Sequence, residues 1–396
     1  MPLSRSSAQS GEKAVEVGFG QGSRARVKPF LTQRTDKDMR SQPVIHIVGA
    51  RPQFIKLSVV TEAFRQRGVP FKVVHTGQHY DHSMSETHFQ ALKLDAPDYH
   101  LRIGSSSHAG QTARMLEAVE EVLLAEKPGL VIVYGDTNST LAGALGAVKL
   151  GIEVAHVEAG VRSFEKFMPE EINRVVTDHV ASYHFCPTTN AVNLLEREGL
   201  KGIFTGDVMY DALLRFSQAG ISHPYRPPFV LATIHRAENT DDPKRFAGIW
   251  KGLELVSRSA PVIFPAHPRT SHLHPELVGS DVGGLTVIEP VSYLTMLAMI
   301  RDAACIITDS GGVQKEAYLL DTPCVTVRDV TEWPETVEAG ANVLVSPDPA
   351  SIFHAFEEMS GKTGFGPGNP FGDGTAAERI ARFVEENILP KAQDRA

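Results

Sequence analysis

Short apolar runs alternate with amphipathic segments of helix length along most of this chain, and the alternation limits the folds it can adopt. In the first half the runs are rich in Val and Ile and lie at residues 44–50, 71–77, 129–135 and 152–158. Continuous runs of this kind are typical of strands buried on both faces, as in a parallel sheet. The intervening segments, such as QFIKLSVVTEAFRQRG, are long enough to return over the sheet as helices. The pattern predicts repeated β-α-β units.

The pattern stops in the Pro- and Gly-rich stretch SQAGISHPYRPP and then starts again. The second set of runs lies at residues 229–235, 261–267, 285–290, 304–310 and 323–329. A chain of 396 residues has the length of about two domains. We therefore predict an α/β protein of two Rossmann-like, doubly wound domains that face a cleft. The predicted parts are a first domain at 41–216, a linker at 217–228 and a second domain at 229–390.

Residues 1–40 differ from the rest of the chain. They are rich in Ser, Gly, Arg and Lys, show little periodicity and lack the apolar core of a secretory signal. The string GFGQGS follows no strand pattern and lacks the third glycine of a dinucleotide fingerprint, which favours a tail over a phosphate loop. We expect a flexible, dispensable extension, with the working chain beginning near Met39.

Composition excludes several classes of partner. The formal net charge of −8 gives no global attraction to nucleic acid or to an anionic membrane. No apolar run approaches the ~18–20 residues of a membrane span. The three cysteines are far apart, which favours buried thiols in a cytoplasmic protein over disulfides. No HExxH motif or comparable ligand set occurs, so we expect neither a metal nor another cofactor.

Unusual polar residues follow the predicted strands, at the edge where open α/β sheets bind their ligands. These residues are Arg51, Lys56, Asp136, Glu158, His235, Arg236, His267 and Ser310. Each of them could instead cap a helix or satisfy a buried polar group. So many polar strand ends facing one cleft favour a ligand site.

The turn Ser310–Gly311–Gly312 precedes the helical pattern VQKEAYLL. Backbone N–H groups in such a turn can approach an anion closely, and the helix dipole favours negative charge there. Glu316 lies one turn into the helix, where it could meet a ribose diol. The alternative is that Ser310 caps the helix and Glu316 is an exposed charge.

Three carboxylates mark the other side of the predicted site. Asp136 and Glu158 end apolar strands, where desolvation and mutual repulsion can raise a pKa towards neutrality. Glu170 begins a predicted helix, and Arg174 shares its face at i+4. This pair is either a surface ion pair worth less than ~1 kcal/mol or a carboxylate held by an arginine and suited to proton transfer.

Together these motifs resemble the non-hydrolysing UDP-N-acetylglucosamine 2-epimerases, which have a glycosyltransferase-B-like architecture of two Rossmann domains. The matching strings are GARPQFIK, HTGQH, YGDTNST, HVEAGVRS, PEEINR, TIHRAEN, PAHPRT, DSGGVQKEA and RDVTEWPE. They run in consistent order from about residue 44 to residue 345. The resemblance implies a UDP-sugar ligand, no cofactor and a homodimer.

The resemblance also implies roles for individual residues. The catalytic carboxylates it implies are Asp136, Glu158 and Glu170, supported by Arg174 and His235. The implied UDP-sugar contacts are Arg51 and Lys56 in the first motif, Ser310, Gly311 and Gly312 at the diphosphate, and Glu316 at the ribose. We add Arg236 and His267 to the binding residues because they follow neighbouring strands.

The implied reaction expels UDP from C1 while a base removes the C2 proton, which gives a 2-acetamidoglucal. UDP then adds back after protonation on the opposite face. Direct deprotonation is hard because C2 has no neighbouring carbonyl, and the chain has no nicotinamide fingerprint for prior oxidation. This route needs a diphosphate clamp and proton-transfer groups near both faces of the sugar.

Some positions depart from the family pattern. Gln53 stands where many bacterial members have Glu, Ala237 where they have a second arginine, and Gly110 where regulated members have arginine. These positions help to form an allosteric UDP-N-acetylglucosamine site, so we expect no such activation. The GARPQFIK, MPEEINR and HPRT forms are similar to the subgroup acting on UDP-2,3-diacetamido-2,3-dideoxy-glucuronic acid, so both sugars stay open.

Three other classes compete with this interpretation. They are a glycosyltransferase of the same architecture, a hydrolysing epimerase and a non-catalytic nucleotide-sugar sensor. Three carboxylates at one site argue against the glycosyltransferase and would have no function in the sensor.

Overall fold

The computed structural model describes residues 42–78, 92, 94–217, 222–365 and 369–389. The predicted extension at 1–40 lies outside the described residues, as do residues 218–221 of the predicted linker. Within the described ranges, no helix combines the length and apolarity needed to cross a membrane.

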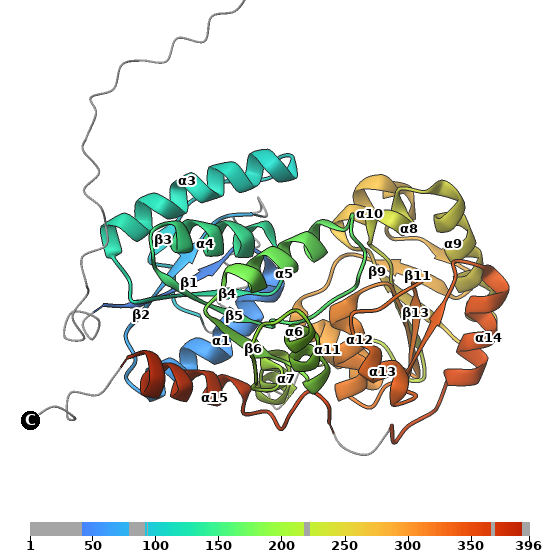
Figure 1. Ribbon diagram of the computed structural model, residues 1–396. Coiled ribbons are helices and arrows are strands. Elements are labelled where there is room, and N and C mark those ends of the chain that lie inside the picture. Colours follow the sequence, from blue (N-terminus) through green and yellow to red (C-terminus); the bar gives the residue numbers. More distant parts are fainter. Residues whose placement is uncertain (1–41, 79–91, 93, 218–221, 366–368, 390–396) are drawn as a thin grey trace, which may run out of the picture. The chain divides into compact units, whose positions relative to one another are not determined.

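The first half of the chain forms a seven-stranded sheet of order β3-β2-β1-β4-β5-β6-β7 (Figure 1). Its strands are β1 (Val44–Val48), β2 (Phe71–His75), β3 (Tyr99–His100), β4 (Leu130–Tyr134), β5 (Glu153–Val157), β6 (Tyr183–Cys186) and β7 (Gly202–Phe204). All neighbouring strands pair in parallel. The strand order reverses between β1 and β4, which is where open sheets bind ligands.

Helices cover both faces of this sheet because alternate residues of each strand point to opposite sides. In β1, Val44 and Val48 join one apolar core that includes α1, whereas Ile45 and Ile47 join another that includes α3 and α4. The helices of this half are α1 (Arg51–Gln66), α3 (His108–Glu126), α4 (Asn138–Lys149), α5 (Pro169–Val180), α6 (Thr189–Arg197) and α7 (Val208–Ser217).

The second half repeats the plan in a sheet of order β10-β11-β9-β8-β12-β13-β14. Its strands are β8 (Val230–Thr233), β9 (Val262–Pro265), β10 (Asp281–Val282), β11 (Leu285–Ile288), β12 (Cys305–Thr308), β13 (Cys324–Val327) and β14 (Asn342–Val345). All pairs are parallel except β10 with β11. Each of the nine predicted apolar runs contains a strand, which confirms the α/β prediction. The unpredicted strands β3, β6, β7, β10 and β14 are short.

The second sheet is also covered by helices on both faces, with separate apolar cores around its buried strands. These helices are α8 (Ala237–Thr240), α9 (Pro243–Ser257), α10 (Pro268–Leu273), α11 (Tyr293–Asp302), α12 (Gly311–Leu319), α13 (Pro334–Glu338) and α14 (Pro349–Met359), with a 3-10 turn at Pro275–Leu277.

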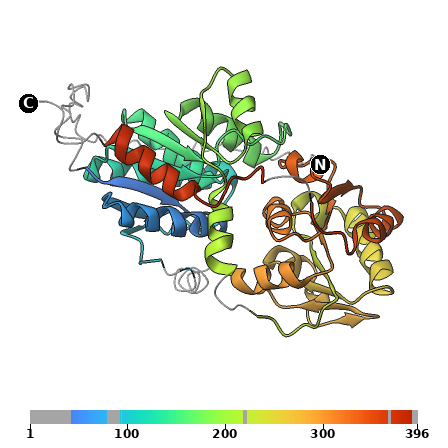
Figure 2. The ribbon, with the colours of Figure 1, turned by 90° about the horizontal axis from the view of Figure 1, so that it is seen from below.

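The C-terminal segment returns to the first sheet. Helix α15 (Ala376–Phe383) and the π-helical turn Val384–Ile388 place Ile380, Val384 and Ile388 in the same apolar core as α1. Both views show α15 beside α1 (Figures 1 and 2). This segment packs with the first sheet although it falls within the predicted 229–390 range, and the domain limits themselves stay a prediction.

Candidate active site

Asp136 lies just beyond β4, where Gly135 has a φ of 61° and turns the chain out of the strand. Its carboxylate accepts a short hydrogen bond from the buried Arg174 guanidinium of α5. The Asn173 amide donates to the backbone oxygen of Asp136 at 2.9 Å. These two bonds fix α5 against the end of β4 and hold one predicted carboxylate beside one predicted arginine.

The predicted pairing of Glu170 with Arg174 is wrong. Arg174 instead donates to Glu171 at 3.1 Å, and that carboxylate accepts from the backbone N–H groups of Ser163 and Phe164, both at 2.9 Å. The i+4 spacing failed because the buried face of α5 is its polar face, and that face carries Glu171. Glu170 is half-buried and forms no hydrogen bond or ion pair with the part of the chain that the structure describes. It is therefore free to meet a ligand.

Glu158 follows β5 with a φ of 74°, a left-handed conformation that few residues other than glycine adopt. Its carboxylate accepts from Lys56 Nζ at 2.7 Å and from Lys315 Nζ at 2.9 Å. Burial alone would raise the pKa of Glu158, but the two ammonium groups, Lys315 more than Lys56, lower it below its usual range. The prediction that its pKa rises towards neutrality is wrong, because lysines rather than carboxylates surround it.

Asp136 and Glu158 share one corner of the sheet. A Cβ atom placed on Gly135 would lie 3.2 Å from Lys56 Nζ and 3.5 Å from Glu158 Oε1. The Lys56–Glu158 pair therefore packs directly against the residue that precedes Asp136. The structure brings together two of the three predicted carboxylates at this point, with the third at the start of the neighbouring helix.

Ser310 occupies the N-cap position of α12, but its hydroxyl makes no capping hydrogen bond to the helix. The first N–H groups of any helix have no partner within the helix. A Cβ on Gly311 would lie 3.3 Å from Trp333 Nε1 and 3.4 Å from Glu332 Oε2. The turn is thus a backbone surface beside an indole N–H and the Arg236 guanidinium, which are donors that suit an anion, while Glu332 lies close by as the partner of that guanidinium. The capping alternative for Ser310 does not hold.

Glu316 is buried on α12 rather than exposed. Burial raises its pKa to about 7, against the opposing effects of Tyr293, Lys315 and Arg51. Arg51 comes from the start of α1 in the first half, and burial lowers its pKa while the charge of Glu316 acts to raise it. The predicted ribose residue and the predicted N-terminal arginine therefore interact electrostatically across the two halves.

His235 and Arg236 follow β8 and are held by Asp309, which is fully buried at the end of β12. Asp309 accepts from the backbone N–H groups of His235 at 3.1 Å and Arg236 at 2.9 Å. The His235 ring stacks on that of His267 with centroids 4.5 Å apart, and burial lowers the pKa of His235. The predicted residues of this half thus lie together around the ends of β8, β9 and β12.

Glu332 is a buried residue that the sequence did not point to. It accepts from Arg328 at 2.6 Å and Arg236 at 3.2 Å, and lies 3.8 Å from Arg174 of the first half. Burial opposes its ionisation, but Arg236, Arg328 and Arg174 lower the pKa of Glu332 to about 2. The only sequence signal for a role of Glu332 was its place within the motif RDVTEWPE, because Arg174 and Arg236 are distant from it in sequence.

Side chains from the first half therefore contact side chains from the second half at several places. One contact joins Glu158 to Lys315, three residues after Gly312 on α12. Another joins Arg174 to Glu332, whose carboxylate also pairs with Arg236. Within the described residues, no three His, Cys, Asp or Glu side chains gather as they would to hold a metal ion.

Two doubly wound sheets, with ionisable groups from one half against a glycine turn of the other, define a glycosyltransferase-B-like enzyme of the α/β class. The sequence profile of the family described as UDP-N-acetylglucosamine 2-epimerase matches residues 62–385. The chain belongs to this family, and it is an isomerase that acts on UDP-sugars at C2. The family resemblance seen in the motifs is confirmed.

Several relatives match over nearly their whole length. The chain is 48% identical to the UDP-2,3-diacetamido-2,3-dideoxy-D-glucuronate 2-epimerase of Pseudomonas aeruginosa, over 86% of this chain and 99% of that protein. It is 34% identical to the UDP-N-acetylglucosamine 2-epimerase of Escherichia coli O157:H7, over 87% and 99% of the two chains. Among solved structures, the Methanocaldococcus jannaschii UDP-GlcNAc 2-epimerase in complex with UDP-GlcNAc and UDP superposes with a TM-score of 0.81 at 43% identity, covering 87% and 99% of the two chains.

Proposed function

We propose that this enzyme interconverts UDP-N-acetylglucosamine and UDP-N-acetylmannosamine without hydrolysis. The supporting observation is the ion pair between Glu158 and Lys315, which joins a carboxylate after β5 to the helix that begins at the glycine turn. A UDP-sugar with its diphosphate at Gly311 and Gly312 would place its hexosamine towards the carboxylates of the first half. A nucleotide-sugar whose C1–O bond must break needs this arrangement.

In the proposed reaction the C1–O bond breaks and its electron pair leaves with UDP, while the C2 proton passes to a base. Re-addition forms the C1–O bond again and returns a proton to C2 from the opposite face, so substrate and product are isomers. Backbone N–H groups of the turn, with Arg51, Lys56 and Arg236, stabilise the departing diphosphate. Glu316 binds the ribose, and His235 and His267 line the binding region.

The three carboxylates have different surroundings, and we assign them different tasks. Glu158 is paired with two lysines and stays ionised, so it opposes the positive charge that develops at the anomeric carbon. Asp136 is partly exposed and oriented by Arg174, and Glu170 has no hydrogen bond or ion pair to the described residues. These two carboxylates are the proton carriers for the two faces.

UDP-2,3-diacetamido-2,3-dideoxy-glucuronate is the second candidate substrate. The favouring observation is the 48% identity to the P. aeruginosa enzyme named for that sugar, compared with 44% to the M. jannaschii enzyme named for UDP-N-acetylglucosamine. The same residues would perform the same chemistry at C2 of either sugar.

Proton NMR in D2O with each UDP-sugar tests the function and selects the substrate. We expect deuterium to enter C2 while UDP remains attached, and the 2-epimer to accumulate. Release of free sugar with UDP would instead indicate a hydrolysing epimerase. UDP release that requires an added acceptor would indicate a glycosyltransferase.

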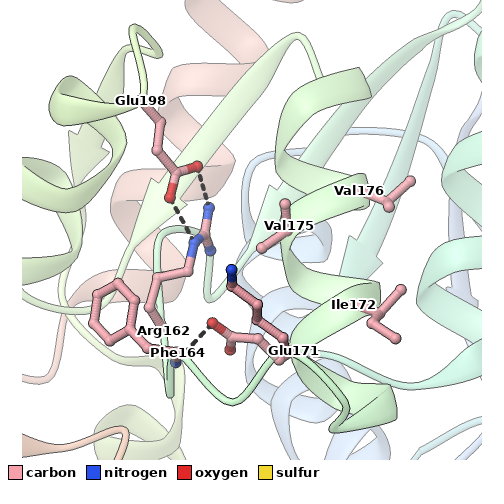
Figure 3. A pocket seen from close by; sticks show the side chains of 8 residues that line it. Arg162, Phe164, Glu171, Ile172, Val175, Val176 and Glu198 are labelled. Carbon is pink, nitrogen blue, oxygen red and sulfur yellow. Dashed lines mark hydrogen bonds and ion pairs between the residues drawn. The ribbon is translucent and has the colours of Figure 1, made fainter.

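We also propose a cytoplasmic homodimer, as the family resemblance implies. The outward face of α5 carries apolar residues: Ile172 is 48% exposed, and Val175 and Val176 are half-buried. Together with Phe164 these residues line a pocket of about 350 Å³ (Figure 3). Light scattering on the wild type and on Ile172→Glu tests the proposal. A dimer that becomes a monomer in the variant supports it, and a monomeric wild type contradicts it.

A further inference from the structure

Lys315 is a buried lysine of α12 that reaches into the first half of the chain. Its Nζ donates to Glu158 at 2.9 Å and to Asp207 at 2.5 Å, and its side chain is 3% exposed. A buried ammonium group is tolerated only when it is paired, and here two carboxylates pair with it. The mechanism proposed above uses this lysine only as one of two cations that keep Glu158 ionised.

Trp333 holds Lys315 from another side. Lys315 Nζ lies 3.9 Å from the centroid of the indole ring, within the range of a cation–π interaction. The same indole reaches Gly311 with its Nε1 atom. The ammonium group is therefore fixed by two carboxylates and one aromatic ring, and that ring lies close to the glycine turn.

The two lysines on Glu158 differ in their other surroundings. Lys56 lies on α1 with Arg51, and both are proposed to bind the diphosphate, so a bound diphosphate competes with Glu158 for Lys56. Lys315 lies near four protein carboxylates: Glu158, Asp207, Glu316 on its own helix and Glu335 on α13. Since Lys315 is also held by Asp207, we expect it to remain paired with Glu158 when UDP-sugar binds.

We propose that Lys315 is a positioning residue of the epimerase reaction, which fixes the orientation and the negative charge of Glu158. This inference rests on the proposed function. Because Lys315 lies three residues after Gly312, one short helix sets both the diphosphate position and the carboxylate position.

The test compares Lys315→Met with Lys315→Arg in the full chain, using the pH profile of C2 epimerisation. Lys315→Met should lower kcat by about 10- to 100-fold through misplacement of Glu158, with KM changed less than kcat. The acidic limb of the pH profile of Lys315→Met should move up by about 1 pH unit or more. A nearby ammonium group lowers the pKa of a carboxyl group, so the loss of the ammonium group raises that pKa. Lys315→Arg keeps the charge and should keep the wild-type acidic limb.

Two further variants keep the test decisive. Lys315→Met leaves Asp207 buried without its cation, so Lys315→Met with Asp207→Asn removes that charge if the single variant does not fold. Lys362→Met, at an exposed lysine paired with Glu358, is the matched control and should behave as wild type. A folded variant with the wild-type pH profile overturns the inference, as does a loss confined to the affinity for UDP. Absence of C2 exchange in the wild type would instead overturn the proposed function.

Discussion

Gln53 joins the ends of the two central strands of the first sheet by donating from Nε2 to the backbone oxygen of Tyr134 at 2.7 Å. Its Oε1 accepts from the N–H groups of Gly49 at 2.7 Å and Ala50 at 3.0 Å. The side chain is almost fully buried at the point where the strand order reverses. Gln53 is one of the positions that depart from the family pattern, and here it fixes the strand ends that carry Arg51 and Asp136.

Gln53→Met should therefore destabilise the enzyme. The substitution keeps the length of the side chain but removes the hydrogen-bond partner of the buried N–H groups of Gly49 and Ala50, at a cost of about 2–3 kcal/mol or more. The backbone oxygen of Tyr134 keeps its hydrogen bond from Thr140. Urea unfolding measures the loss. Gln66→Ala, at the exposed end of the same helix, is the control and should change stability by less than about 0.5 kcal/mol. Equal effects of the two substitutions would contradict this account.

Glu170 and Glu171 are neighbours that should respond in opposite ways. Glu170→Gln removes a free carboxylate, so kcat should fall by about 10²–10⁴-fold with little change in Tm. Glu171→Gln weakens the hydrogen bonds to Ser163, Phe164 and Arg174, so Tm should fall clearly. NMR rates and calorimetry on both variants check the contrast. A Tm loss in Glu170→Gln with no loss of kcat would reverse the assignment.

Asp178 should make the enzyme sensitive to acid. Its carboxylate accepts from His156 at 2.6 Å and from Arg162 at 2.7 Å, and these partners, against the effect of burial, lower its pKa to about 2. Because the pKa of Asp178 is lower in the folded state than in the unfolded state, where it is near 4, its ionisation stabilises the fold at pH values above about 4. This stabilisation is lost as the pH falls towards 2. At neutral pH the ionised Asp178 contributes about 2 kcal/mol to the free energy of unfolding.

Urea unfolding of the wild type and Asp178→Asn at several pH values between 7 and 3 measures this contribution. Asp178→Asn should be less stable than the wild type at pH 7. The difference between their free energies of unfolding should become smaller as the pH falls below about 4. If this difference in free energy stays constant over the pH range, the ionisation of Asp178 does not contribute to stability.

Gly160 should not tolerate a side chain. Gly160 lies two residues after Glu158 and has a φ of 79°. A Cβ atom on Gly160 would lie 2.4 Å from the backbone oxygen of Ala191 on α6. We expect Gly160→Ala to cost about 3 kcal/mol or more and to lower activity. Gly151 has a similar φ of 68° but no atom within 4 Å, so Gly151→Ala should cost only about 1–2 kcal/mol. Thermal unfolding of both variants separates the clash from the backbone strain, and similar losses would remove the clash as a cause.

The sequence by itself determined the strands and the strand ends. Val and Ile runs such as residues 44–50 and 129–135 can be buried on both faces only in a parallel sheet, so their order predicted both sheets and placed Asp136, Glu158 and Ser310 at the binding edge. Strand β6 was missed because its sequence, YHFC, contains neither Val nor Ile and so lacks the apolar run that marks the predicted strands.

The tertiary structure alone decided which charges meet. Lys315 and Glu158 are separated by 157 positions, and Arg174 and Glu332 lie on different halves of the chain, so no local pattern relates them. Helical spacing favoured Glu170 as the partner of Arg174, but packing turned the other face of α5 inwards and selected Glu171. Periodicity depends on neighbours in sequence, whereas an ion pair depends on side-chain direction and burial, which exist only once the chain has folded.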